Sequence, residues 1–191
     1  MYTNIFYIFI FLPVIGIWAA SEILVQMGVR RRQRSVLREA KEDRGSMLVS
    51  LGVGLMGLVL SFLCPILLPG FNLAWQPGAF FLGLGAASLG IVLRWAAILT
   101  LGPYFTGKIV IQADHAIIQR GPYKLMRHPS YTGALLLAIG IGVMLGNWIS
   151  LAVIVVGLFI GLLYRIPVEE QALSHVPGYT EYMRHTKRLV P

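Results

Sequence analysis

Long apolar stretches constrain what this chain can fold into more than any other feature of the sequence. An α-helix rises about 1.5 Å per residue, so about 20 apolar residues cross the roughly 30 Å hydrocarbon core of a bilayer. Three stretches meet this requirement: residues 5–25, 47–68 and 78–101. A fourth, residues 131–166, is too long for one span and is interrupted by Gly146, Asn147 and Trp148, which predicts a tight hairpin of two rather short helices. The pattern predicts an all-α integral membrane protein with about five transmembrane helices, the last two forming this hairpin.

The composition excludes several other classes of protein. Of the 191 residues, 57% are hydrophobic and 13% are charged, and a soluble domain of this size could not bury so much apolar surface. Disordered chains need low hydrophobicity, which this sequence lacks. The single cysteine, Cys64, excludes an internal disulfide and a cysteine-rich metal site. We expect one compact membrane domain over residues 1–191, without a metal.

Basic residues occur in three blocks that alternate with loops lacking them. The formal net charge is +8, but this blockwise arrangement indicates membrane topology and not a nucleic-acid partner. The blocks are Arg30, Arg31, Arg32, Arg34, Arg38, Lys41 and Arg44; Lys108, Arg120, Lys124 and Arg127; and Arg165, Arg184, Lys187 and Arg188. Residues 69–77 and the turn at Gly146 contain none. The positive-inside rule therefore predicts an outside N-terminus and a cytoplasmic C-terminus, with residues 30–34 as an orientation signal that contacts lipid headgroups.

Glycines are frequent within the predicted spans, where small residues let helix backbones approach each other closely in lipid. We expect this packing role for Gly52, Gly54, Gly57, Gly83, Gly85, Gly90, Gly133, Gly140 and Gly142. Residues 83–88 resemble a dinucleotide-binding fingerprint, but they follow no predicted strand and lie within a span. A nucleotide-type cofactor must therefore be held in another way.

Polar residues capable of chemistry are concentrated in residues 108–131 and 165–191, which the predicted topology places on the cytoplasmic side. Pro122 suits the start of a short helix, and Pro129 suits the first turn of the fourth span. We expect the fifth span to end before Pro167, followed by a new helix, then a break at Pro177 and a last short helix from Tyr179. The two segments can meet at one membrane surface as a small cytoplasmic cap.

Taken one at a time, these residues also have simpler structural interpretations. Arg127, Lys124 and Arg165 could contact lipid headgroups, and the tyrosines could form an interfacial belt. Glu169 and Glu170 could complement a helix dipole. Arg94 could extend its guanidinium to the cytoplasmic surface or face a polar cavity.

In combination, these residues form four motifs that indicate a function more specifically than the single residues do. They are Gly121-Pro122-Tyr123, then Arg127-His128-Pro129-Ser130-Tyr131, then Arg165-x-x-x-Glu169-Glu170 and Tyr179-x-x-Tyr182. Together they closely resemble the isoprenylcysteine carboxyl methyltransferase family over about residues 94–191, which would form the cofactor-binding and catalytic region. The N-terminal spans, residues 1–77, match the family only in hydropathy, apart from Asp43-Arg44-Gly45-Ser46, which looks like the turn before a span in bacterial members.

The resemblance implies a cofactor, an acceptor and a set of site residues. S-adenosylmethionine would be held by the cytoplasmic segments, and a lipophilic, membrane-embedded carboxylate would be the methyl acceptor, such as a prenylated cysteine. The implied cofactor-binding residues are His115, Ala116, Ile117, Ile118, Tyr123, His128, Pro129, Ser130, Tyr131, Glu169 and Glu170. The implied catalytic residues are Arg165, which falls where the family has the arginine that meets the substrate carboxylate, and Arg127.

These residue types suit methyl transfer. A sulfonium cation is attracted to aromatic faces such as those of Tyr123 and Tyr131, and an amino group or a ribose hydroxyl needs an acceptor such as Glu169. An ionised carboxylate attacks in line without a metal or a general base, and arginine orients planar carboxylates bidentately. The sequence leaves three alternatives open: a phospholipid-type N-methyltransferase, an NADPH-dependent sterol-reductase-like enzyme, and a non-enzymatic membrane scaffold. It also leaves the oligomeric state open.

Overall fold

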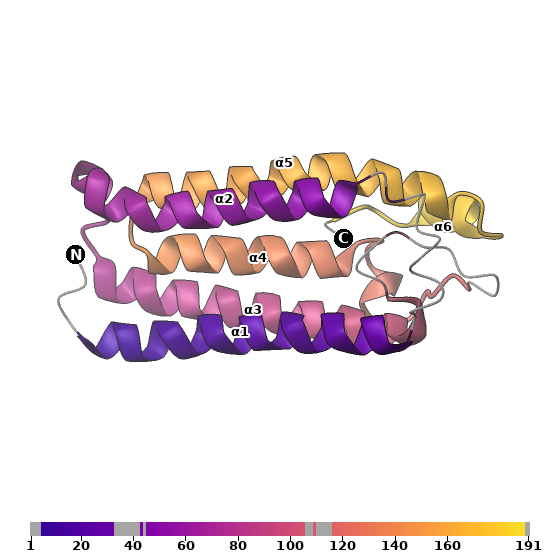
Figure 1. Ribbon diagram of the computed structural model, residues 1–191, viewed down its shortest axis with the longest axis horizontal. Coiled ribbons are helices and arrows are strands. Elements are labelled where there is room, and N and C mark those ends of the chain that lie inside the picture. The colour runs from indigo at the N-terminus through magenta and orange to yellow at the C-terminus, as the bar shows by residue number, and fades with distance from the viewer. Residues whose placement is uncertain (1–4, 33–42, 44, 106–108, 110–115, 190–191) are drawn as a thin grey trace.

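The computed structural model describes residues 5–32, 43, 45–105, 109 and 116–189, and within this part of the chain every regular element is a helix (Figure 1). Five long helices lie side by side along the long axis of the molecule, and a short sixth helix lies beyond their ends. The elements are α1 (Ile5–Arg32), α2 (Ser46–Leu67), η2 (Pro69–Phe71), α3 (Gln76–Leu101), η3 (Gly102–Tyr104), η4 (Gly121–Lys124), α4 (Pro129–Met144), α5 (Trp148–Leu173) and α6 (Tyr179–His185), where η marks a 3₁₀ helix.

Three of the helices are long and apolar enough, by length and composition, to cross a membrane. They are α2, a stretch of α3 that continues to Tyr104, and α5. The segment Phe9–Leu24 of α1 and the whole of α4 are shorter apolar helices. Large apolar side chains point outward from the bundle, and Leu48 and Leu99 are 76% and 77% exposed, as suits contact with lipid. The predicted all-helical membrane fold is confirmed at this level.

Glycines bring α3 and α4 into close backbone contact. A Cβ atom added at Gly90 would lie 2.5 Å from the backbone nitrogen of Leu137, and one added at Gly133 would lie 2.7 Å from the carbonyl oxygen of Gly90. Any larger residue at these positions would force the two backbones apart. Gly85, on the same helix as Gly90, has open space where its Cβ would be. The predicted packing role is thus confirmed for Gly90 and Gly133, and likewise for Gly83 and Gly140, but not for Gly52 and Gly85, where the added atom has open space.

The turn between α4 and α5 is fixed by one buried asparagine. The Oδ1 atom of Asn147 accepts hydrogen bonds from the backbone N–H groups of Ile149 and Ser150, both at 3.0 Å, and so caps α5. Its Nδ2 atom donates to the carbonyl oxygen of Leu68 at 3.0 Å and to Oδ1 of Asn72 at 2.8 Å. The predicted hairpin is confirmed, and the same side chain joins it to the end of α2.

The expectation that the fifth span ends before Pro167 is wrong, because α5 continues without a break to Leu173. Pro167 is exposed, whereas Arg165, Ile166 and Glu170 are buried. Packing of these buried side chains keeps the helix continuous although proline removes one backbone hydrogen bond. As a consequence, Arg165 and Glu169 lie four residues apart on one helix and therefore share a face. Helix α1 is also longer than expected and ends at Arg32.

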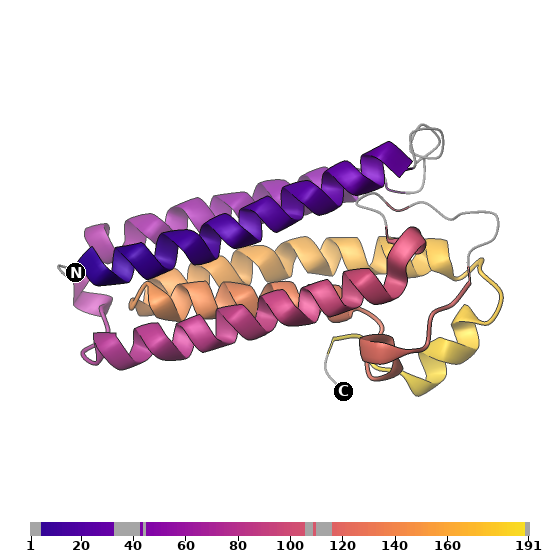
Figure 2. The same cartoon turned by 90° about the horizontal axis from the view of Figure 1, so that it is seen from below.

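The segments predicted to be cytoplasmic meet at one end of the bundle. Figure 2 shows η4 and α6 next to each other, alongside the ends of α3 and α5. The backbone N–H groups of Arg127 and His128 donate to the carbonyl oxygens of Lys187 and Arg188 at 2.8 and 3.0 Å. The predicted meeting of the two segments is confirmed, as is the start of α4 at Pro129. The basic residues Arg34, Arg38, Lys41, Arg44 and Lys108 lie outside the described residues.

We expect Gly90→Ala to destabilise the protein, whereas Gly85→Ala does not. Alanine favours a helix over glycine by about 1 kcal/mol at either position, but only at position 90 does the new methyl group collide with a neighbouring backbone, at a typical cost of about 1–3 kcal/mol. The thermal unfolding midpoint of the detergent-purified protein should therefore fall for Gly90→Ala and stay level or rise for Gly85→Ala. Equal midpoints for the two variants would contradict the proposed close contact.

Candidate active site

A cavity of about 510 Å³ lies at the end of the bundle where these segments meet. Its polar side chains come from α1, α2 and η3 as well as from α3, α4, α5, α6 and the segment before α4. They are Glu22, Ser50, Arg94, Tyr104, Tyr123, Arg127, His128, Ser130, Tyr131, Arg165, Glu169, Tyr179 and Tyr182. The apolar side chains include Trp18 and Ile23 of α1, Leu51 of α2, and Leu158 and Leu162 of α5.

Most of the residues predicted for the site line this cavity. They are Ala116, Ile117, Ile118, Tyr123, Arg127, His128, Ser130, Tyr131, Arg165 and Glu169. Two predicted residues are not on its wall: Pro129, which is fully buried in the first turn of α4, and Glu170, whose carboxylate contacts Arg127, His128 and Arg188. His115 lies outside the described residues. The folding of a loop and a tail around one cavity thus brings together most of what the motifs indicated.

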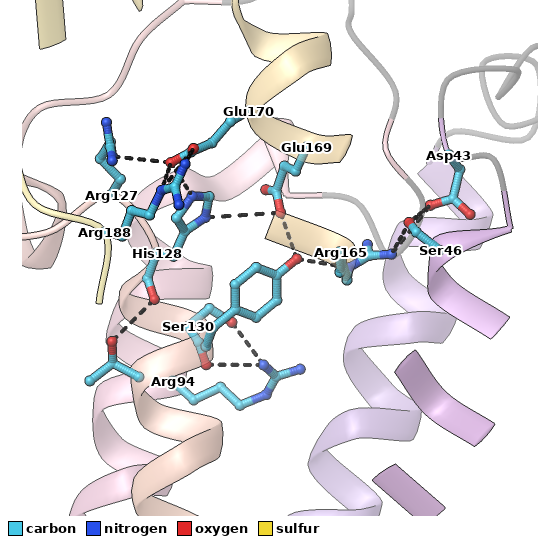
Figure 3. A network of polar contacts seen from close by, with 12 residues as sticks. Asp43, Ser46, Arg94, Arg127, His128, Ser130, Arg165, Glu169, Glu170 and Arg188 are labelled. Atoms are coloured by element: carbon cyan, nitrogen blue, oxygen red, sulfur yellow. Dashed lines mark hydrogen bonds and ion pairs between the residues drawn. The ribbon is translucent and has the colours of Figure 1, made fainter. Parts of the chain in front are cut away.

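A chain of hydrogen bonds crosses the cavity wall from α5 to the start of α2. The Tyr131 hydroxyl donates to Oε2 of Glu169 at 2.6 Å and accepts from Nε of Arg165 at 2.8 Å. On its other side, Nη1 of Arg165 lies 3.1 Å from Oγ of Ser46 and 3.3 Å from Oδ1 of Asp43 (Figure 3). The buried guanidinium of Arg165 is therefore positioned by α4 and by the start of α2, with Asp43 as its counter-ion.

The carboxylate of Glu170 holds the cap to the end of α5. It is buried and lies among three nitrogen-bearing side chains (Figure 3). Its Oε1 atom lies 3.2 Å from Nε of Arg127 and 3.2 Å from Nε2 of His128, and its Oε2 atom lies 2.7 Å from Nη2 of Arg188. Arg127 and His128 belong to the segment before α4, and Arg188 belongs to the segment after α6. Glu170 therefore fixes both segments to α5.

A further ion pair joins α1 to the bundle. Arg94 of α3 pairs with Glu22 of α1, and its Nη2 atom donates to Oε2 of Glu22 at 2.9 Å. Its Nη1 atom donates to Oγ of Ser130 at 2.8 Å. Of the two placements left open for Arg94, the structure shows the side chain on the cavity wall.

Burial and hydrogen bonding set the charge states around the cavity. Burial alone raises the pKa of Asp43, but the backbone N–H groups of Ile109 and Met47 and the charge of Arg165 outweigh it, so the pKa lies below its usual value. Burial raises the pKa of Tyr182 to about 12, and burial together with the charge of Glu169 raises the pKa of Tyr123. At neutral pH, Asp43 is therefore ionised and these tyrosines keep their protons.

Sequence reasoning missed four residues of these networks: Glu22, Asp43, Ser46 and Arg188. Asp43 and Ser46 carry a local signal, because an acidic residue followed by serine just before an apolar run is typical of a helix start, and Asp43 does accept from the backbone N–H of Met47 at 3.3 Å. The contacts that Glu22 and Asp43 make with Arg94 and Arg165 join residues far apart in the sequence, so no local pattern could have indicated them.

The arrangement can bind a polar small molecule beside an apolar chain. Glu169 offers an acceptor, Arg127 and Arg165 offer charged donors, and the tyrosine rings offer aromatic faces for a cation. Among the described residues, no group of three or more His, Cys, Asp or Glu side chains is placed to hold a metal ion.

Comparisons with known proteins agree with one another. The model of the isoprenylcysteine carboxyl methyltransferase family matches residues 82–175. Protein-S-isoprenylcysteine O-methyltransferase B of Arabidopsis thaliana is 36% identical over 159 residues, which cover 80% of each chain. The corresponding Schizosaccharomyces pombe protein is 31% identical over 112 residues, which cover 56% of this chain and 48% of that one.

A solved structure gives the same result at the level of the fold. The eukaryotic intramembrane Ras methyltransferase ICMT matches with a TM-score of 0.60 and 28% sequence identity, and the match covers 73% of this chain. This chain spans 50% of that relative's length. From the relative in Arabidopsis, the family match and this fold, the chain belongs to the isoprenylcysteine carboxyl methyltransferase family.

Proposed function

We propose that this protein transfers the methyl group of S-adenosylmethionine to the carboxylate of a lipophilic acceptor, such as a prenylated cysteine, at the membrane surface. The observation that carries this proposal is the mixed wall of the cavity, to which α3, α4, α6 and the segment before α4 contribute most of the polar side chains, while α1 and α2 contribute mainly apolar ones. Arg165 lies on this wall, between the acidic residues Glu169 and Asp43 to which its hydrogen bonds lead. A water-soluble methyl donor and a lipid-borne carboxylate need such a site.

The residues present fit the cofactor. The volume of about 510 Å³ falls in the range of roughly 300–1,000 Å³ that is usual for small-molecule sites. Glu169 can accept hydrogen bonds from an amino group, and Arg127 can donate to a carboxylate. The ring of Tyr131 lines the cavity while its hydroxyl is held by Glu169 and Arg165, so its face is fixed in orientation. When bound, S-adenosylmethionine supplies a methyl group on a positively charged sulfur.

Arg165 would orient the carboxylate of the acceptor. An arginine that fully neutralised this carboxylate would make it a weaker nucleophile, and the contact with Asp43 counters this effect because the guanidinium already shares its charge. The bond from Arg165 to Tyr131 also couples the orientation of the acceptor to Glu169 on the cofactor side. In this scheme the protein accelerates transfer by holding two reactants in line and excluding water.

The acceptor would approach through the apolar part of the wall. Trp18 and Ile23 of α1, Leu51 of α2 and Leu158 of α5 line this part, and all belong to apolar helices. A prenyl or acyl chain can leave the bilayer and enter between such side chains with little change in hydrophobic free energy. The relatives act on isoprenylcysteine by name, which supports a prenylated acceptor for this chain.

The whole chain would form one domain with five spans and a cytoplasmic site. Both the N-terminal helices and residues 94–182 contribute side chains to the same cavity, which supports a single functional unit. The predicted cytoplasmic segments lie together at one end of the bundle (Figure 2), as the positive-inside pattern requires. The cofactor would then reach the cap from the cytoplasm.

We expect Glu169→Gln to weaken binding of S-adenosylhomocysteine, the demethylated cofactor, about tenfold or more. Glutamine can still accept from Tyr131, so the substitution removes the charge but keeps the hydrogen bond, and charge-assisted bonds are about twice as strong as neutral ones. Isothermal titration calorimetry on the detergent-purified protein gives the dissociation constant. Glu181→Gln is the matched control, because the Glu181 side chain is 62% exposed on α6. Absence of binding by the unchanged protein at millimolar ligand would refute the proposed function.

We expect Arg165→Lys to lower kcat/KM for a prenylated acceptor at least tenfold and to leave the dissociation constant of S-adenosylhomocysteine within about twofold. Lysine keeps the charge but loses the planar pair of donors that a carboxylate needs. The assay measures transfer of tritiated methyl groups to S-farnesylcysteine, with its carboxamide as the control substrate and Arg184→Lys, an exposed position, as the control variant. Methylation of the carboxamide, or full activity of Arg165→Lys, would contradict the assignment of Arg165.

A further inference from the structure

One buried hydroxyl group on the cavity wall has no assigned role. Tyr179, the first residue of α6, is 3% exposed and lines the cavity. Within the described part of the chain, its hydroxyl oxygen is buried and has no hydrogen-bond partner. The other buried atom of this kind, Nε of Arg127, lies 3.2 Å from Oε1 of Glu170 and so has an ion-pair partner. A buried hydroxyl without a partner is rare in folded proteins and needs an explanation, and a bound ligand that accepts its hydrogen bond would supply one.

Two other tyrosines on the cavity wall use their hydroxyl groups for hydrogen bonds within the protein. The hydroxyl of Tyr182, three residues along α6, donates to the carbonyl oxygen of Tyr123 at 2.6 Å and so fixes α6 to η4. The hydroxyl of Tyr131 donates to Glu169. Tyr179 packs with its ring tilted against that of Tyr182, with 6.1 Å between the ring centroids, and its hydroxyl contributes to neither network. The hydroxyl is therefore not needed to hold the described part of the fold together.

The surroundings of Tyr179 indicate which ligand it would meet. Its charged neighbours are Glu170 and Glu169 of α5 and Arg127 of the segment before α4, whereas the side chains that α1 and α2 contribute to the wall are mainly apolar. Burial, reinforced by the charges of Glu170 and Glu169, raises the pKa of the Tyr179 hydroxyl, so it carries its proton at neutral pH and can donate. A prenyl chain has no acceptor atom, while an S-adenosyl compound has several in its carboxylate, ribose and adenine.

We propose that Tyr179 is a further cofactor-binding residue, whose hydroxyl donates a hydrogen bond to the S-adenosyl cofactor from the cap side of the cavity. This inference rests on the proposed function. It adds α6 to the binding machinery, so the tail would contribute directly to cofactor affinity as well as closing the site.

The test compares three tyrosine-to-phenylalanine variants, each of which removes one hydroxyl group. We expect Tyr179→Phe to weaken binding of S-adenosylhomocysteine about tenfold, in the range for loss of one buried hydrogen bond, without lowering the unfolding midpoint of the ligand-free protein. Tyr182→Phe should lower that midpoint, because it breaks a bond within the protein. Tyr164→Phe, at a side chain on the exposed face of α5, should change neither quantity. Calorimetry and thermal unfolding in detergent give both readouts.

Each other outcome has a distinct meaning. If Tyr179→Phe binds S-adenosylhomocysteine within twofold of the unchanged protein, or destabilises the ligand-free protein as Tyr182→Phe does, the inference is wrong. It is also wrong if the variant raises only the KM for S-farnesylcysteine, since the hydroxyl would then serve the acceptor. If the unchanged protein binds no S-adenosylhomocysteine, the proposed function itself fails, and that result is separable from a defect confined to the variant.

Discussion

The site depends on the contacts of one buried carboxylate, that of Glu170. A buried carboxylate is costly unless charged partners surround it, and removing one partner of such a group typically costs about 3–5 kcal/mol. Here the partners are Arg127, His128 and Arg188, which lie on the two segments of chain that form the cap. Because these segments also form part of the cavity wall, the contacts that stabilise this carboxylate also hold the wall of the cavity in place. Glu170 thus shapes the site without touching its interior.

The rest of the molecule is held together by a different kind of contact. Between apolar helices in lipid the hydrophobic effect gives little driving force, so close backbone packing has to supply the attraction. Gly90 and Gly133 provide it between α3 and α4, and Gly57 and Gly157 meet in the same way between α2 and α5. Arg94 and Ser130 sit on this α3–α4 pair at the end nearest the cap. The glycine contacts therefore determine how far apart the polar side chains of the cavity stand.

Features of this structure that depend on residues close together in the sequence could be predicted, whereas features that depend on contacts between distant residues could not. The apolar helices, the hairpin at Asn147 and the helix start at Pro129 follow from apolar length and turn residues, and all were predicted. The continuity of α5 through Pro167 was not, because it depends on burial of Arg165 and Ile166 against other helices. Glu169 and Glu170 look alike in the sequence, but adjacent helical positions point about 100° apart, so one faces the cavity and the other faces the cap.

The positions of Glu169 and Arg165 along α5 explain how one short segment of helix would serve both a water-soluble methyl donor and a lipid-soluble acceptor. Glu169 and Arg165 lie on one face of α5 and are bridged by Tyr131, so the part of the helix nearer the cap contacts the polar wall while the part nearer the membrane reaches Ser46 at the start of α2. A donor bound from water and an acceptor arriving from lipid would therefore be aligned by a single rigid helix and not by two moving parts. Since in-line transfer requires that alignment more than any acid, base or metal, the continuity of α5 through Pro167 would, in the proposed mechanism, serve the reaction as well as the fold.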